Sequence, residues 1–422
     1  MLDIKFIKNN LDLVKENINK RYTFADAELT IKLYDEKNQI QVELDDLRQK
    51  RNINAGKMKV KLDQNEREKL IEEGKGLKSK ISQLEEKLNI LNKQYHEELI
   101  KIPNMTHPTT PIGATEKDSK VIKEAVNIRQ LNFKPKDHIE LGKELDLIDF
   151  ENAAKVSGQK FYYLKNEGAL IEIALVQFAM KILVEKGFTP YITPDLARDS
   201  ILDGIGFNPR GNETNVYSVK DTNLCLIGTA EITLGGLYSD TIIPDDQLPV
   251  KMVGFSHCFR TEAGAAGKTQ KGLYRVHQFS KVEMFAITKE EDAENMHEEF
   301  LKIEEEIYNK LEIPYRVLNI ASGDLGAQAY KKYDLEAWMP GRQEFGEITS
   351  TSNCTDYQSR RLNIRYKDKS GENKIAYMLN GTVIAVPRVI IAILENYQNE
   401  DGSVNIPKNL IPYIGIKVIN KK

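Results

Sequence analysis

Cysteine is scarce in this chain and long apolar runs are absent, and each of these two features argues against a class of protein. In 422 residues there are three cysteines, one tryptophan and a net charge of −3. Cys225, Cys258 and Cys354 lie far apart without a CxxC pair, which argues against a disulfide framework and a structural zinc site. No apolar run approaches the roughly 18 residues that span a bilayer. The start of the chain resembles neither a secretory signal nor a transit peptide. We therefore expect a cytoplasmic protein without membrane insertion.

The two common nucleotide-binding loops are also missing. Residues 264–269, Gly-Ala-Ala-Gly-Lys-Thr, end like a P-loop, but Glu262 occupies the position of its first glycine. Residues 204–206, Gly-Ile-Gly, begin like a Rossmann fingerprint, but Pro209 stands where the third glycine belongs. If the protein binds ATP, it does so through another kind of site.

Residues 25–98 are almost free of proline and aromatic residues, and this composition predicts long helices. Apolar residues recur there at steps of three and four, regularly in the second half and more loosely in the first. They are Leu77, Ile81, Leu84, Leu88 and Leu91, preceded by Leu29, Leu33, Ile40, Leu44 and Leu47. Residues 61–66 lack the stripe and suit a turn followed by a new helix start. We predict an antiparallel coiled-coil hairpin, roughly 45 Å long at 1.5 Å per residue.

The outer part of this hairpin has a charge opposite to that of the whole chain. Residues 48–80 hold eleven basic and five acidic side chains, a net charge of +6. A rigid basic rod suits the backbone of double-stranded RNA, which proteins recognise mainly by shape and phosphate contacts. The alternative is a solvated surface on a dimerising coiled coil.

Three prolines within residues 102–113 mark a boundary between two domains, which we place at 1–110 and 111–422. The second domain shows helical patterns at 167–187 and at about 290–311. Strand patterns occur at 250–259, 274–287, 315–320 and 347–352. Because strands follow one another without a helix after each, the fold class is α+β, with a largely antiparallel sheet flanked by helices.

Three segments of the second domain resemble the class II aminoacyl-tRNA synthetases. Phe-Arg-Thr-Glu at 259–262, followed by Gly-Leu-Tyr-Arg-Val-His-Gln-Phe at 272–279, resembles motif 2, two antiparallel strands joined by a loop. Residues 380–388 resemble motif 3, and residues 187–194 resemble motif 1, which makes the dimer interface in that class. Three motifs in the right order are far more specific than any one of them.

Shorter signatures are similar to those of the bacterial-type seryl-tRNA synthetases, as are the basic hairpin and the proline-rich linker. They are Thr-Ala-Glu at 229–231, Lys-Val-Glu at 281–283, Tyr-Asp-Leu-Glu-Ala-Trp at 333–338 and Glu-Ile-Thr-Ser-Thr-Ser-Asn at 347–353. Two residues depart from the pattern. Ser280 replaces a commonly acidic residue, and Thr349 replaces a commoner serine.

This resemblance implies a serine–tRNA ligase. Such an enzyme activates L-serine with ATP to seryl-adenylate and diphosphate, and then transfers serine to the 3′ end of tRNA(Ser), with AMP as the second product. The implied cofactors are ATP, as a substrate, and Mg²⁺. The implied partners are a second copy of the chain, tRNA(Ser) and, as a second candidate, tRNA(Sec). Two alternatives remain: a tRNA-binding paralogue without aminoacylation activity, and an amino-acid:carrier-protein ligase, which would lack the arm.

The resemblance also implies roles for individual residues, grouped here by ligand. The catalytic residues are Arg260, Arg388 and Glu347. L-serine would bind to Thr229, Ala230, Glu231, Arg260, Glu283 and Thr382. ATP would bind to Arg260, Thr261, Glu262, Val276, Phe279, Glu347, Ile348, Thr349, Ser350 and Arg388. Mg²⁺ would bind to Glu347 and Ser350.

The chemistry of these residue types fits the reaction. Attack of the serine carboxylate on the α-phosphate builds charge that cations can stabilise, and Arg260 has a fork suited to bidentate contacts. Arg388 would lie near the γ-phosphate and against the adenine, opposite Phe279. Each residue also has a plainer interpretation: a salt-bridged arginine, a core aromatic for Phe279, and an exposed cross-strand partner for Glu283.

Overall fold

The computed structural model describes residues 1–60, 63–124, 128–207, 215–263 and 271–421, and the chain forms two compact units, Met1–Pro103 and Asn104–Lys422. The P-loop-like segment 264–269 and Pro209 lie outside the described residues, as do Lys61 and Leu62 of the predicted turn. No helix in the described ranges is long and apolar enough to cross a membrane.

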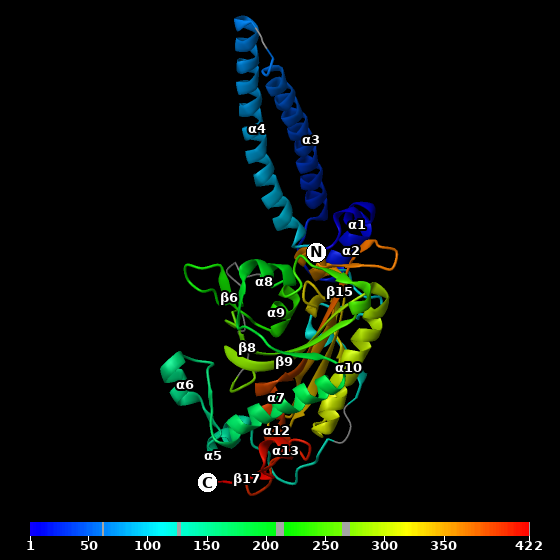
Figure 1. Ribbon diagram of the computed structural model, residues 1–422. Coiled ribbons are helices and arrows are strands. Elements are labelled where there is room, and N and C mark those ends of the chain that lie inside the picture. The colour runs from blue at the N-terminus through cyan, green and yellow to red at the C-terminus, as the bar shows by residue number, and fades with distance from the viewer. Residues whose placement is uncertain (61–62, 125–127, 208–214, 264–270, 422) are drawn as a thin grey trace. The chain divides into compact units, whose positions relative to one another are not determined.

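The first unit is helical throughout its described elements. It contains α1 (Ile4–Asn9), α2 (Leu11–Lys20), α3 (Ala27–Lys57) and α4 (Gln64–Leu99). The two long helices, drawn in blue in Figure 1, confirm the hairpin that was predicted over 25–98. Both begin at an aspartate: Asp26 accepts from the backbone N–H of Leu29, and Asp63 accepts from that of Glu66. Such N-caps satisfy backbone donors that lack a partner in the first turn.

Apolar side chains join α3 to α4. Leu33, Ile40 and Leu91 are buried together, with Leu84, Leu88 and Tyr95 packed against them. Farther out, Arg48 pairs with Glu85 at 2.8 Å and Asn54 donates to Glu73 at 2.9 Å. The predicted stripe is wrong at Leu29, which is 38% exposed. The inward positions at this end of α3 are taken by Ala27 and Thr30.

The second unit is built on one large sheet, which has eight strands in the described residues, in the order β1-β10-β11-β12-β15-β9-β8-β4. In that order they span Lys120–Lys123, Tyr315–Asn319, Lys331–Met339, Glu344–Asn353, Tyr377–Ala385, Gln278–Thr288, Val250–Phe259 and Thr189–Ile192. Every pairing is antiparallel except that of β4 with β8, so the predicted α+β class is confirmed. The strand expected from residue 274 begins only at Gln278.

Helices cover both faces of this sheet (Figure 1). On one face, α7 (Glu167–Glu185), α10 (Ala293–Lys310) and α12 (Val386–Asn396) share a core with Val282, Met284 and Ala286 of β9. On the other, α8 (Asp199–Ile205), α9 (Ala230–Gly236) and α11 (Tyr357–Leu362) pack with Phe285 and Ile287. Alternation along β9 therefore separates the two cores.

Short elements complete the unit. The helices are α5 (His138–Glu144), α6 (Phe150–Ser157) and α13 (Ile411–Ile414), with 3-10 turns at Glu116–Asp118, Asp245–Gln247, Glu290–Asp292 and Ser322–Asp324. The strands are β2 (Ile148–Asp149), β3 (Tyr163–Leu164), β5 (Leu196–Arg198), β6 (Leu224–Leu226), β7 (Ile242–Pro244), β13 (Arg365–Lys367), β14 (Asn373–Ile375), β16 (Val404–Asn405) and β17 (Val418–Ile419).

Two bulges interrupt the regular alternation of the large sheet. In β12, Glu347 pairs with Glu336 and Thr349 with Leu335, which makes Ile348 an extra residue. In β15, Thr382 pairs with Glu283 and Ile384 with Val282, which leaves Val383 as the extra residue. A bulge shifts the side chains that follow it to the opposite face from the one that strict alternation would give. Both bulges lie beside a cavity over β9, β12 and β15.

Candidate active site

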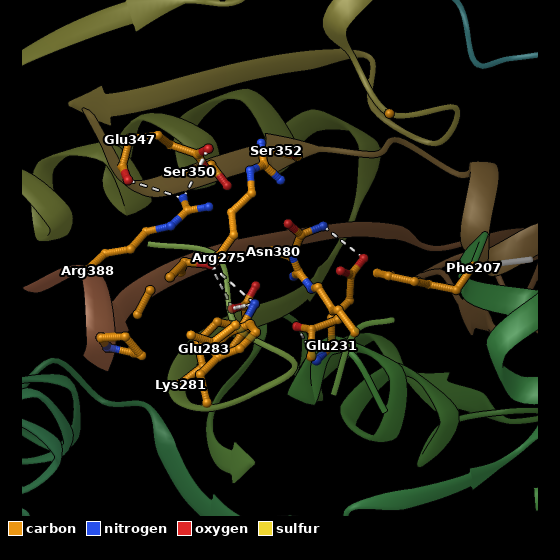
Figure 2. Close-up of a pocket in the computed structure, with 18 of the residues that line it drawn as sticks. Phe207, Glu231, Arg275, Lys281, Glu283, Glu347, Ser350, Ser352, Asn380 and Arg388 are labelled. Atoms are coloured by element: carbon orange, nitrogen blue, oxygen red, sulfur yellow. Dashed lines mark hydrogen bonds and ion pairs between the residues drawn. The ribbon is translucent and has the colours of Figure 1, made fainter. Parts of the chain in front are cut away.

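A cavity of about 330 Å³ opens over β9, β12 and β15. Eleven of the fifteen residues predicted for ligand binding line it: Thr229, Glu231, Arg260, Glu262, Val276, Phe279, Glu283, Glu347, Ser350, Thr382 and Arg388. In the view of Figure 2, Glu347 and Arg388 lie at one end of the cavity, Phe207 and Glu231 at the other, and Lys281 and Glu283 between them. The cavity is therefore lined by charges of both signs.

The β12 bulge explains how Glu347 and Ser350 reach the same cavity. Three residues apart, they would face opposite sides of a regular strand, but the extra residue Ile348 restores them to one face. On β15, Thr382 and Ala385 are likewise three apart with Val383 inserted, and both line the cavity. On β9 no bulge is needed, because Phe279, Lys281 and Glu283 alternate regularly.

Glu231 reaches the cavity because α9 packs closely on the sheet. A Cβ atom added to Gly254 of β8 would lie 2.9 Å from the Cβ of Ala230, so only glycine permits this approach. Thr229 caps the helix and accepts from the backbone N–H of Glu231 at 3.3 Å. The Glu231 carboxylate accepts from Gln358 at 2.7 Å and from Asn380 at 3.0 Å. Burial, together with the charge of Glu283, raises the pKa of Glu231 to about 7.

Arg260 follows β8 and lies beside an aromatic ring. Its guanidinium is 5.4 Å from the centre of the Phe279 ring, and it donates to the carbonyl of Gly228 at 3.2 Å. Its Nε is buried and has no hydrogen-bond partner in the described part of the chain. A buried donor of this kind has unused capacity for a ligand oxygen. Beyond it, Glu262 pairs with Arg275 at 3.4 Å.

Glu347 and Arg388 form an ion pair of 3.1 Å at the other end of the cavity. Burial opposes the charge on Glu347, but Arg388 and Lys332 outweigh it and lower the pKa of the carboxyl to about 2. The guanidiniums of Arg388 and Arg342 lie 4.8 and 4.7 Å from the centre of the Tyr274 ring. Gly346 leaves room for that ring, since a Cβ there would be 3.1 Å from it. Arg388 is thus held between the Glu347 carboxylate and the face of the Tyr274 ring.

Glu283 is buried in the floor of the cavity rather than exposed. Its exposed fraction is 2%, and across the sheet it pairs with Gly254 and Thr382. Its Oε2 accepts from the Thr382 hydroxyl at 3.0 Å and lies 2.5 Å from the Lys281 ammonium. The interpretation of Glu283 as an exposed cross-strand partner is therefore wrong.

Four predicted residues do not line the cavity. Ala230 packs against Gly254, and Ile348 lies in the core shared with α7, α10 and α12. Thr349 is buried and donates its hydroxyl to the carbonyl of Thr382. The backbone N–H of Thr261 donates to the carbonyl of Asn215. Each is the sequence neighbour of a residue that does line the cavity.

Several lining residues had no predicted role. They are Phe207, Leu273, Tyr274, Arg275, Lys281, Gly326, Gln328, Ala329, Lys332, Ser352, Asn380, Ala385 and Pro387. Two of them could have been found from the pattern alone. Lys281 lies two residues before Glu283, and Asn380 two residues before Thr382, so each shares a strand face with a predicted residue.

Comparisons with known proteins agree with this geometry. Residues 1–106 match the family model of the seryl-tRNA synthetase N-terminal domain, and residues 216–397 match the class II tRNA synthetase core domain (G, H, P, S and T). A serine–tRNA ligase of Borreliella afzelii is 57% identical, with 99% of each chain covered. One of Treponema denticola is 55% identical, with 98% of this chain and 99% of that protein covered.

A solved structure matches over the whole chain as well. The seryl-tRNA synthetase of Pyrococcus horikoshii, complexed with ATP, superposes with a TM-score of 0.88 at 40% identity and covers 100% of both chains. Family models, full-length relatives and fold therefore agree, and the chain belongs to the seryl-tRNA synthetases.

Proposed function

We propose that the cavity activates L-serine with ATP to form seryl-adenylate, and that the chain then transfers serine to tRNA(Ser). The observation that carries this proposal is one cavity that holds anions for an ammonium, an arginine with a buried and unused Nε donor for a carboxylate and phosphate, and a hydroxyl-bearing floor. Glu231 and Thr229 bind the serine ammonium, Arg260 binds its carboxylate and the α-phosphate, and Glu283 with Thr382 binds its hydroxyl. Phe279, Glu262 and the backbone of Val276 bind adenine, and Arg388 binds the γ-phosphate.

The proposal is tested by serine-dependent exchange of diphosphate into ATP. We expect exchange with serine and little with any other proteinogenic amino acid. The same preparation should charge tRNA(Ser), and tRNA(Sec) is the second acceptor to assay. An enzyme that binds tRNA but shows no exchange with any amino acid would instead be the paralogue without aminoacylation activity.

Mg²⁺ fits the donors at one end of the cavity. Glu347 stays ionised because its pKa is low, and the Ser350 hydroxyl faces the same space. Hard oxygen ligands suit Mg²⁺, which commonly takes its remaining ligands from water and substrate phosphates. When bound, the ion would neutralise phosphate charge. The part of the protein is to hold the two oxygens in place, Glu347 through Arg388 and both through the β12 bulge.

Serine activation should depend on pH through Glu231. Its raised pKa means that the carboxyl is protonated below about pH 7, so the serine ammonium loses its counter-charge as the solution becomes more acidic. We expect kcat/KM for serine to fall by roughly 15-fold in total between about pH 7 and 5.5, with a slope that approaches tenfold per pH unit at the acid end, while KM for ATP changes little. Exchange rates across this range measure the effect. Glu231→Gln should be weak but lack this slope; a flat profile in the parent enzyme would contradict the assignment.

We also propose a twofold homodimer formed through the motif 1 region. Apolar side chains are exposed there: Leu170 at 46%, Ile173 at 55% and Val184 at 48% on α7, and Ile192 at 84% on β4. Burial of such a surface against a second copy of the same surface favours an isologous dimer. Sedimentation should show a dimer, which Ile173→Glu with Ile192→Glu converts to monomer. The control is Val42→Glu, at a 71% exposed position on the arm; an unchanged dimer in the double variant would overturn the placement.

The remaining assignments concern the two domains. We assign residues 1–110 to tRNA binding and residues 111–422 to catalysis, in the cytoplasm, where tRNA is charged for translation. The support is the basic outer hairpin in the first region and the cavity in the second.

A further inference from the structure

Two buried carboxylates line the cavity, but their neighbours differ in charge. Glu283 forms an ion pair with Lys281, whose ammonium is 2.5 Å from its Oε2. Glu231 receives its hydrogen bonds from the neutral amides of Gln358 and Asn380, and in the described residues no ion pair is formed with it. Figure 2 shows both arrangements, with Lys281 against Glu283 and Asn380 against Glu231. The charge of Glu283 is therefore balanced by Lys281, whereas no ion pair among the described residues balances the charge of Glu231.

The Lys281 ammonium is fixed where it lies. Its side chain is 6% exposed, and it also donates to the Thr382 hydroxyl at 3.3 Å, while that hydroxyl donates to Glu283. A buried charge is stable only when it is paired and hydrogen bonded, so neither Lys281 nor Glu283 can leave the other without a large cost. Among the described residues, the two polar partners of Glu283 both contact Oε2, which leaves Oε1 as the oxygen that can accept from a ligand.

We propose that Lys281 is a positioning and specificity-determining residue that reserves Glu283 for a neutral hydroxyl donor and thereby directs the substrate ammonium to Glu231. This inference rests on the proposed serine pocket and adds the device that orients the amino acid in it. A neutralised carboxylate still accepts a hydrogen bond from a hydroxyl, but it attracts a cation much less than an unpaired one does. Without Lys281, the pocket would offer two unpaired anions and would favour a substrate with two cationic groups.

That consequence identifies a probe. L-2,3-diaminopropionate is serine with an amine in place of the hydroxyl, so it has nearly the same shape but can place a second ammonium beside Glu283. In the parent enzyme the Lys281 charge should repel this ammonium, because like charges in a buried site are strongly unfavourable. Without the Lys281 charge, the side-chain ammonium of 2,3-diaminopropionate should instead form an ion pair with Glu283.

The experiment compares serine and 2,3-diaminopropionate in diphosphate exchange for the parent, Lys281→Met, Lys281→Gln and Lys281→Arg. We expect Met to raise KM for serine roughly 100-fold and to raise the diaminopropionate-to-serine ratio of kcat/KM by at least about 100-fold, with KM for ATP within about twofold. Gln keeps a donor for Glu283 and should change the ratio in the same direction with a smaller loss of serine activity. Arg keeps the charge and should keep the preference for serine. Gln also serves as the test if Met does not fold.

Three outcomes are distinguishable. A ratio that stays within about threefold of the parent value in both folded neutral variants would overturn the proposal. Equal losses for both amino acids, with a raised KM for ATP, would overturn it too, because Lys281 would then bind carboxylate or phosphate. Absence of serine-dependent exchange in the parent enzyme would instead refute the proposed function, whatever the variants do.

Discussion

Replacing Glu283 with alanine is expected to lower the serine-to-alanine ratio of kcat/KM by a factor of roughly 10³. Alanine differs from serine only in lacking the hydroxyl. A site built to hydrogen-bond a hydroxyl can reject the analogue without it by roughly 10⁴ to 10⁵, because its buried polar group is then left unpaired. Glu283 is such a group, because it is buried and only its Oε2 is bonded to Thr382 and Lys281, so that Oε1 is left to accept from the serine hydroxyl. Its removal should impair serine strongly and alanine far less.

The measurement is diphosphate exchange with each amino acid, for the parent, Glu283→Gln and Glu283→Ala. Gln keeps the size of the side chain and should lose less than Ala. Because either change leaves Lys281 without its partner, thermal unfolding and KM for ATP must be measured alongside. A ratio that does not change, in a folded variant that binds ATP, would remove Glu283 from the serine site.

Removal of the outer hairpin should abolish tRNA charging while serine activation continues. The residues that line the cavity all lie in the second unit, whereas the excess positive charge lies in the hairpin. Loss of several phosphate contacts weakens binding to a nucleic acid by orders of magnitude, so we expect kcat/KM for tRNA to fall by about 10³ or more. Deletion of residues 25–98 should have this effect, with serine-dependent exchange kept within about twofold.

A shorter deletion tests the same idea with less disturbance. Arg48 of α3 and Glu85 of α4 are already paired at 2.8 Å, so a glycine-rich turn can join the helices there in place of residues 49–84. This variant keeps the apolar contacts of Leu33, Ile40 and Leu91. Full tRNA charging by it would show that the basic outer part is not the tRNA-binding surface. Loss of exchange in the folded protein would refute the separation of the two tasks.

The sequence predicted the elements whose pattern is long and local. The two ends of the hairpin, predicted at residues 25 and 98, lie within about two residues of Ala27 and Leu99, because the apolar stripe and the near absence of proline are both visible in the chain. Leu29 was misassigned because an apolar residue one turn from a helix end fits a stripe whether or not a partner helix reaches it. Tyr274 was placed in a strand because a strand pattern does not reveal where cross-strand pairing starts; β9 pairs with β8 only from Gln278.

The candidate site was predicted through motifs, which identify segments rather than faces. Whole triplets such as Thr229-Ala230-Glu231 were assigned to the ligand, yet Ala230 packs on Gly254. Lys281 was missed although it stands in a quoted motif, two residues before Glu283 on the same strand face; the spacing could have placed it at the cavity, but its ion pair with Glu283 is visible only in the folded strand. The bulges at Ile348 and Val383 were also unpredictable, since nothing in the residue types there distinguishes an extra residue from a paired one.

The β12 bulge constrains how this region can change over evolution. Loops between strands can gain or lose residues while the strands keep their positions. The interval between Glu347 and Ser350 has no such freedom, because a strand has two faces and one inserted or deleted residue there would turn Ser350 away from the cavity. Substitutions can accumulate at Ile348 as long as the side chain fills the core. Selection must therefore preserve the number of residues between Glu347 and Ser350 more strictly than the identity of those residues.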